Sequence, residues 1–260
     1  SVYRHSNSYH EERIEKNMKR VMLIISYDGT AYHGWQIQPD AISVQGEIQR
    51  CLSTILRRET LIVGAGRTDT GVHARYMAAH FDSDEQIDCQ QLAFRLNRIL
   101  PPDIAIHDIA QVRDDLHARF SATSRTYRYY IHTRKSPFNR KYSLETHYTL
   151  DFEMMNCAGE YLLSVTDFAS FCKAGSDVKT TFCKVTTAKW VEMEPGCWYF
   201  EITADRFLRN MVRAVVGTLV DVGRGRLTLD EFKQVVNSKK RTEARESMPA
   251  RALFLENVTY

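Results

Sequence analysis

Short apolar runs alternate with two helical patterns in the first half of the chain. The run at 21–27 predicts a strand, because it is rich in the residues that strands favour. Ser43 is a typical N-cap residue, and apolar side chains recur at helical spacing through 44–56. Asp88 precedes a second helical pattern, which ends at Pro101. The remaining strands of this half are expected at 61–65, 77–82 and 104–109.

The second half of the chain repeats that order of elements. One helix is expected after Asp151, through residue 163, and another from 207 to 222, where Gly223 ends the pattern. A hairpin turn is expected at Glu194-Pro195-Gly196. The strands are expected at 126–131, 185–191, 198–203 and 252–260. Each half therefore has the order β-α-β-β-α-β, which predicts the α+β class with two ferredoxin-like halves.

These elements divide the chain into three parts. Residues 1–19 are polar and without a pattern, and we expect them to form a flexible tail. The two α/β halves are expected at 20–112 and 113–260. The 260 residues are 43% hydrophobic, enough to bury one large core or two smaller ones. No apolar stretch approaches the roughly 20 residues of a membrane span, and no signal-peptide core is present, so we expect a soluble protein.

Basic residues are unevenly distributed, although the net charge is only +3. Between positions 113 and 141 the sequence has eight Lys or Arg and only two acidic residues. A local basic surface can bind a phosphate backbone even when the total charge is near zero. A solvated strand face followed by a charged loop would have the same composition.

The cysteines and histidines form none of the common metal-binding or redox motifs. The six cysteines lie at least 11 residues apart, so no CxxC pair exists, and the nine histidines form no HxH or HxxxH pair. We therefore expect a reduced, cytoplasmic protein without a metal ion.

The segment that indicates chemistry most clearly is GAGRTDTGVHA at 64–74. Its three glycines allow a tight backbone that a large ligand can approach closely. Arg67 and Asp69 are two residues apart, so in an extended segment they point to the same side and the cation flanks the carboxylate. Such a pair suits a carboxylate that acts as a nucleophile or a base.

Other interpretations of this segment also have to be weighed. A dinucleotide-binding fingerprint would have glycine where Asp69 stands, and a carboxylate there would repel a pyrophosphate. A P-loop would need a GK[ST] sequence, which is missing. An ordinary Asp-Thr-Gly turn, in which the carboxylate accepts backbone N–H groups, would have the same sequence. The motif alone does not separate this turn from a catalytic aspartate.

Six groups of residues, taken in order, resemble the motifs of one known family. They are Tyr27-Asp28-Gly29-Thr30 with Gly34-Trp35-Gln36, GRTDTGVHA at 66–74, LHARFSA at 116–122, RTYRY at 125–129, DFASF at 167–171 and FLRNMVR at 207–213. Any one of these would be weak evidence, but six in the same order are specific. The sequence therefore resembles the tRNA pseudouridine synthase A family.

The resemblance implies an isomerase that converts uridine to pseudouridine in the anticodon stem-loop of tRNA. In this reaction the bond between ribose C1′ and uracil N1 breaks, the base turns, and C1′ is rejoined to C5. No cofactor or metal is needed, because the product is an isomer. The resemblance also implies a homodimer that holds tRNA across both subunits, and one mixed, mainly antiparallel sheet with a central catalytic cleft.

The resemblance further implies roles for five residues. Asp69 matches the catalytic aspartate, and Arg213 matches the arginine that reaches this carboxylate from the second half. Arg67 matches the arginine that fills the gap left by the flipped base, Tyr127 the tyrosine packed on the uracil, and Leu253 an apolar wall of the cleft. Each has an ordinary alternative, such as a strand-core leucine or a solvent-exposed helix arginine.

The residues expected to contact RNA lie in three segments. They are His117 and Arg119, Arg134 and Lys135, and Lys179. The last segment departs from the family pattern, since Lys179 and Cys183 stand where arginines are usual. Phosphate contacts of this kind position RNA without reading its bases. Solubilising loops would be an alternative role for all three segments.

Two other functions remain open for this sequence. A non-catalytic RNA-binding or chaperone protein on the same fold would keep the basic surface without needing Asp69. A glycosidase-like nucleotide hydrolase would need a pair of carboxylates, and the motif contains only one.

Overall fold

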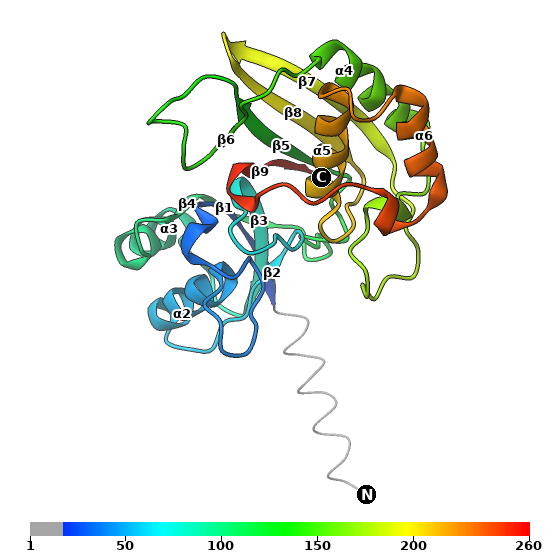
Figure 1. Ribbon diagram of the computed structural model, residues 1–260. Helices are drawn as coiled ribbons and strands as arrows, with labels where there is room; N and C mark the ends of the chain where they lie inside the picture. Colours follow the sequence, from blue (N-terminus) through cyan, green and yellow to red (C-terminus); the bar gives the residue numbers. More distant parts are fainter. Residues whose placement is uncertain (1–17) are drawn as a thin grey trace, which may run out of the picture.

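The structure is a computed structural model that describes residues 18–260 (Figure 1). Of the expected tail at 1–19, residues 1–17 lie outside the described residues. In the first half, strand β1 (Lys19–Tyr27) pairs antiparallel with β3 (His73–Ser83) and with β4 (Ile104–Val112). The short β2 (Val63–Gly64) pairs with β3. Strands were expected at all four places, but β2 is shorter and β3 longer than their apolar runs.

The second half forms the other part of the same sheet. Strand β5 (Ser124–His132) pairs antiparallel with β8 (Cys197–Ala204) and β9 (Leu253–Thr259), and β7 (Val185–Glu194) pairs with β8. The two-residue β6 (Leu144–Glu145), which was not predicted, lies parallel to β5.

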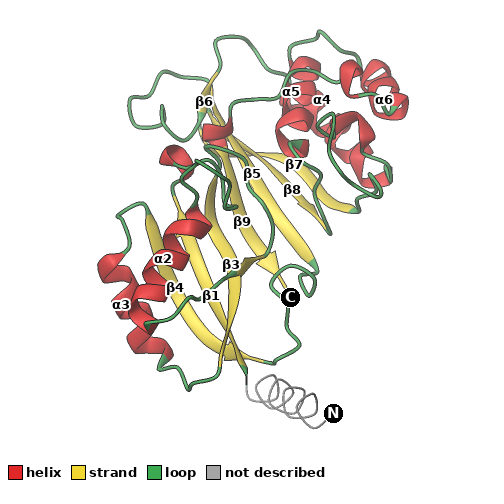
Figure 2. Ribbon diagram, turned by 90° about the horizontal axis from the view of Figure 1, so that it is seen from below, coloured by secondary structure: helices red, strands yellow, loops and turns green. Residues whose placement is uncertain are grey.

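One mixed sheet runs through the whole molecule, in the order β4-β1-β3-β9-β5-β8-β7 (Figure 2). The two parts join where β3 and β9 lie parallel, with His73 opposite Phe254 and Ala74 opposite Leu255. The α+β class and the single, mainly antiparallel sheet are therefore confirmed. The ferredoxin-like nature of each half stays a prediction.

Three helices begin at the capping residues that the sequence indicates. Before α2 (Val44–Leu56), α3 (Cys89–Ile99) and α4 (Phe152–Tyr161), the side chains of Ser43, Asp88 and Asp151 accept a backbone N–H from the first turn. Such a cap stabilises a helix by about 1 kcal/mol. Five short 3-10 helices lie at Gly29–Ala31, Leu162–Ser164, Ala169–Phe171, Arg241–Glu243 and Ala250–Ala252.

Two helices differ from the sequence-based expectation. Helix α5 (Met211–Gly223) begins four residues later than predicted, because Asn210 adopts a left-handed backbone with φ of 65°. Helix α6 (Leu229–Ser238) was not predicted. Thr228 and Glu231 form a capping box at its start, a pattern that the sequence displays and that was overlooked. Within residues 18–260, no helix is long and apolar enough to cross a membrane.

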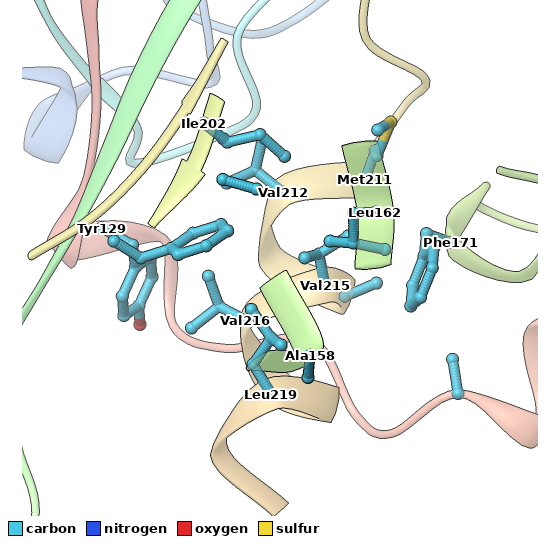
Figure 3. Close-up of a cluster of buried hydrophobic side chains, with 14 of the residues drawn as sticks. Tyr129, Ala158, Leu162, Phe171, Ile202, Met211, Val212, Val215, Val216 and Leu219 are labelled. Carbon is cyan, nitrogen blue, oxygen red and sulfur yellow. The ribbon is translucent and has the colours of Figure 1, made fainter. Parts of the chain in front are cut away.

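Each part of the sheet has its own apolar core. Helices α2 and α3 pack beside the first part, and α4, α5 and α6 beside the second (Figure 1). In the second core, Val212, Val216 and Leu219 of α5 lie among Tyr129, Ile202 and the α4 residue Ala158 (Figure 3). Helix α5 is buried along most of its length, so its position relative to the sheet is strongly constrained.

Gly217 on α5 lies against the segment that leads to β9. An added Cβ would come within 2.0 Å of the backbone oxygen of Glu246, which is too close for any real contact. We expect Gly217→Ala to lower the free energy of unfolding in urea by about 1–3 kcal/mol, because neither backbone can move easily. Gly66→Ala is the control, since no atom lies within 4 Å of its added Cβ. Equal stability of the two variants would contradict this packing.

Candidate active site

The loop that carries Asp69 connects β2 to β3 and is held by the residues before α2. The backbone N–H of Trp35 donates to the backbone oxygen of Thr68 at 3.3 Å. Gly34, with φ of 81°, lies so close that a Cβ would be 2.4 Å from this oxygen, so only glycine fits. The Tyr27 hydroxyl and the Thr68 Oγ1 are 2.7 Å apart in a buried hydrogen bond. The residue next to Asp69 is therefore fixed on two sides.

Arg213 brings the second half of the chain to this carboxylate. Its Nη1 lies 3.3 Å from Asp69 Oδ2, and its Nε donates to the backbone oxygen of Met248 at 2.7 Å. The Met248 N–H donates back to the Arg213 oxygen at 3.1 Å. Side-chain exposure is 22% for Arg213 and 31% for Asp69, so the pair is sheltered but reachable from solvent. The Asp69 carboxylate is therefore held in position and is still accessible to a ligand.

Arg67 takes a different place from the one that its spacing suggests. It lies in the same loop and is exposed. Among residues 18–260, the ion-pair partner of Asp69 is Arg213, and no ion pair joins Arg67 to this carboxylate. The expected flanking cation therefore comes from α5, because the loop between Ala65 and Val72 is not a regular strand. Arg67 remains available to a ligand.

Tyr127 on β5 presents its ring beside the same site. The ring is partly buried and meets Phe207 edge-on, with centroids 4.9 Å apart. Burial and then the charge of Asp69 raise the pKa of Tyr127, while Arg125 opposes them. The hydroxyl therefore stays protonated at neutral pH. Phe207 lies in the segment before the start of α5.

Leu253 is the first residue of β9 and is almost fully buried. It lies opposite Tyr129 and belongs to the core around α5. The structure thus gives it a packing role, and its expected role as a wall of the cleft stays a prediction.

The chain is similar in sequence to known proteins. A family model described as tRNA pseudouridine synthase matches residues 158–260. A protein of Bacteroides thetaiotaomicron named tRNA pseudouridine synthase A is 52% identical over 245 residues, 94% of this chain and 91% of the relative. A relative of the same name from Acetivibrio thermocellus is 41% identical over 94% of this chain and 100% of its own length.

The chain belongs to the tRNA pseudouridine synthase A family. At 52% identity over nearly the whole length, the backbone of the relatives and that of this chain are expected to coincide closely. The six motifs on which the resemblance rests are thereby attributed to the right family. The roles of individual residues are separate questions, and they are proposals below.

Arg125 is a site residue that sequence reasoning missed. Its guanidinium donates to the backbone oxygens of Ala65 at 2.8 Å, of Arg119 at 2.9 Å and of Asp205 at 2.9 Å. It thereby ties the loop that carries Asp69, the turn at 117–121 and the loop before α5 to strand β5. The available signal was its place in the RTYRY motif, two residues before Tyr127.

The expected RNA-contacting residues do not form one cluster. His117 and Arg119 lie in the turn that Arg125 joins to the loop of Asp69. Arg134 and Lys135 are exposed and line a groove of about 970 Å³ beyond the end of β5, which neither Asp69 nor Arg213 lines.

The loop before β7, which departs from the family pattern, places Lys179 and Cys183 in different environments. Lys179 is exposed and can meet a ligand. Cys183 is buried, with its Sγ 3.9 Å from Met211 Sδ, and burial raises the pKa of this thiol to about 12. The residue in place of an arginine has thus become part of the core. Among residues 18–260, no group of three or more His, Cys, Asp or Glu side chains could hold a metal ion.

His80 holds the turn at 117–121 by a hydrogen bond. Its Nδ1 accepts the N–H of Ala118 at 3.0 Å, and burial, followed by the charges of Arg20 and His117, lowers its pKa to about 4. The unfolded chain therefore binds more protons than the folded one between about pH 6.5 and pH 4.

Stability should therefore decrease as the pH falls through this range. We expect urea unfolding of the wild type to lose up to about 1.4 kcal/mol per pH unit through His80, because protonation breaks its bond to Ala118. His80→Asn keeps an acceptor but does not titrate, so its loss should be smaller. His147→Asn is the control, because that side chain is 81% exposed. Parallel pH profiles for wild type and His80→Asn would refute this role.

Proposed function

We propose that this chain isomerises uridine to pseudouridine in tRNA, with Asp69 as the catalytic carboxylate. One observation carries the proposal: the aspartate of the central family motif meets Arg213 from the other half at 3.3 Å, next to Tyr127. The names of relatives at 52% and 41% identity support the same reaction and substrate. We assign the enzyme to the isomerases.

The reaction needs one carboxylate against a base that has left its stack. The bond between C1′ and N1 breaks, the uracil turns within the site, and C1′ bonds to C5, whose hydrogen leaves as a proton. N1 gains a proton, so the product is an isomer and no electrons are exchanged with a third partner. Asp69 could add to the uracil ring, attack C1′ or remove a ribose proton, and all three begin from the same placement.

The neighbouring residues have complementary roles in this proposal. Arg213 orients the Asp69 carboxylate, and its own orientation is fixed by Met248. Arg67, exposed on the same loop, enters the gap in the RNA that the flipped uridine leaves. Tyr127 stacks on the uracil, and Leu253 closes the cleft behind it.

RNA binding extends beyond the cleft. We propose the anticodon stem-loop as the target, with phosphates held by His117, Arg119, Arg134, Lys135 and Lys179. A homodimer in the cytoplasm, with tRNA held across both subunits, is part of the same proposal. So is the division into ferredoxin-like halves at 20–112 and 113–260, with catalytic residues on both. The exposure of the four cations supports the phosphate contacts.

The decisive test is tritium release from unmodified tRNA labelled at uracil C5, by the wild type and by Asp69→Asn. C5 loses its hydrogen only when it becomes the new glycosidic carbon. We expect release by the wild type and none by Asp69→Asn. RNA affinity should change less than about tenfold, because the two side chains have the same shape.

Other outcomes of this experiment identify other functions. Binding of tRNA without release by the wild type would indicate a non-catalytic RNA-binding protein. Liberation of free uracil would indicate a hydrolase.

The role of Tyr127 can be tested separately from that of Asp69. If its ring stacks on uracil, Tyr127→Phe should keep most of the single-turnover rate, whereas Tyr127→Ala should lose about tenfold or more. Stacking needs the ring and not the hydroxyl. Tyr129→Phe is a matched control for the loss of a tyrosine hydroxyl, because the Tyr129 hydroxyl donates to the Pro249 oxygen in the core. Equal losses for Tyr127→Phe and Tyr127→Ala would assign the function to the hydroxyl.

A further inference from the structure

Phe120 is an apolar side chain that belongs to neither apolar core. It is 78% exposed, although it lies in a turn whose backbone is firmly held. The His117 Nδ1 accepts the N–H groups of Arg119 and Phe120, both at 3.1 Å. The Ser121 Oγ accepts the His117 N–H at 2.8 Å. The ring therefore projects from a rigid backbone rather than from a loose loop.

One face of the Phe120 ring is already supported by an aromatic neighbour. The His117 ring stacks on it with centroids 4.3 Å apart and planes at 26°. His117 in turn meets His80 edge-on at 4.8 Å, and His80 is buried. This series of rings fixes the orientation of Phe120. Since 78% of the residue is exposed, its other face is open to a ligand.

Arg125 connects this turn to the loop that carries Asp69. A single nitrogen, Nη2, donates both to the Arg119 oxygen at 2.9 Å and to the Ala65 oxygen at 2.8 Å. Ala65 precedes Asp69 by four residues in the same loop. The turn that presents Phe120 is therefore tied to the loop that carries Asp69.

The surroundings of the ring match a nucleobase rather than an apolar protein surface. The guanidinium of Arg119 lies 5.6 Å from the Phe120 centroid and is exposed. Single-stranded nucleic acid is bound by this combination, in which a base stacks on an aromatic ring and a cation meets the adjacent phosphate. An apolar partner would instead leave this guanidinium desolvated without a counter-ion.

We propose that the open face of Phe120 stacks on an unpaired base of the RNA, next to the uridine that is modified, with Arg119 on its phosphate. This inference rests on the proposed function and adds to it a second base-binding position outside the catalytic pocket. The modified uridine occupies Tyr127 and Asp69, whereas its neighbour in the loop occupies Phe120.

The experiment uses anticodon stem-loop RNA with 2-aminopurine at each unpaired position in turn. Its fluorescence is quenched when the base stacks on an aromatic ring. With wild-type protein we expect quenching at one position besides that of the modified uridine, where the base would stack on Tyr127. Phe120→Leu should remove it and weaken binding about fivefold to a hundredfold. Phe120→Trp should restore both, because a ring is present again.

The chain offers a closely matched control. Phe94 on α3 is 58% exposed and has the guanidinium of Arg98 at 5.7 Å from its ring, but it lies on a helix that packs against β4 and α2 and not in the turn that Arg125 ties to the loop of Asp69. Phe94→Leu should keep quenching and affinity within about twofold of the wild type. Thermal unfolding of Phe120→Leu should match that of the wild type, which excludes a folding defect.

The two proposals fail in distinguishable ways. If the wild type binds the stem-loop and releases tritium, but Phe120→Leu behaves like Phe94→Leu, the stacking position is refuted and the enzyme remains. If the wild type neither binds the stem-loop nor releases tritium, both proposals are overturned.

Discussion

The ion pair between Asp69 and Arg213 is the contact on which the geometry of the candidate site depends. Its two residues are 144 positions apart, with Asp69 in the loop between β2 and β3 and Arg213 on α5. The two parts of the sheet are joined by a short parallel pairing, and this ion pair and the bond from Arg125 to Ala65 are further contacts between them. A displacement of either part would therefore move the Asp69 carboxylate relative to Arg213.

Two arginines illustrate how such a joint can be made precise. Arg213 and Arg125 both donate to backbone oxygens, the first to Met248 and the second to three separate segments. Because a guanidinium is planar and has five donors in fixed directions, it defines distances between segments better than a flexible ammonium does. Backbone oxygens, unlike carboxylates, cannot be lost by substitution of a side chain. The two arginines thus keep their positive charge while their N–H groups hold separate backbone segments together.

Local patterns predicted what depends on local physics. Ser43, Asp88 and Asp151 cap their helices as their sequences indicate, because a cap needs only the next few residues. The start of α5 was placed too early, since the apolar spacing continues across Asn210 while its backbone does not. The partner of Asp69 could not come from spacing, which favoured Arg67. Arg213 entered through family resemblance alone.

The place of β9 in the sheet has a consequence for biosynthesis. Among the strands of residues 18–260 it comes last in the sequence, yet it lies between β3 and β5 and joins the two parts of the sheet. A nascent chain that has not yet emerged beyond residue 253 therefore carries two partial sheets with open edges, which are exposed to premature pairing. Asp69 and Arg213 are both translated well before that point. A nascent chain can thus contain both residues of the ion pair before the strand that joins the two parts of the sheet has been made.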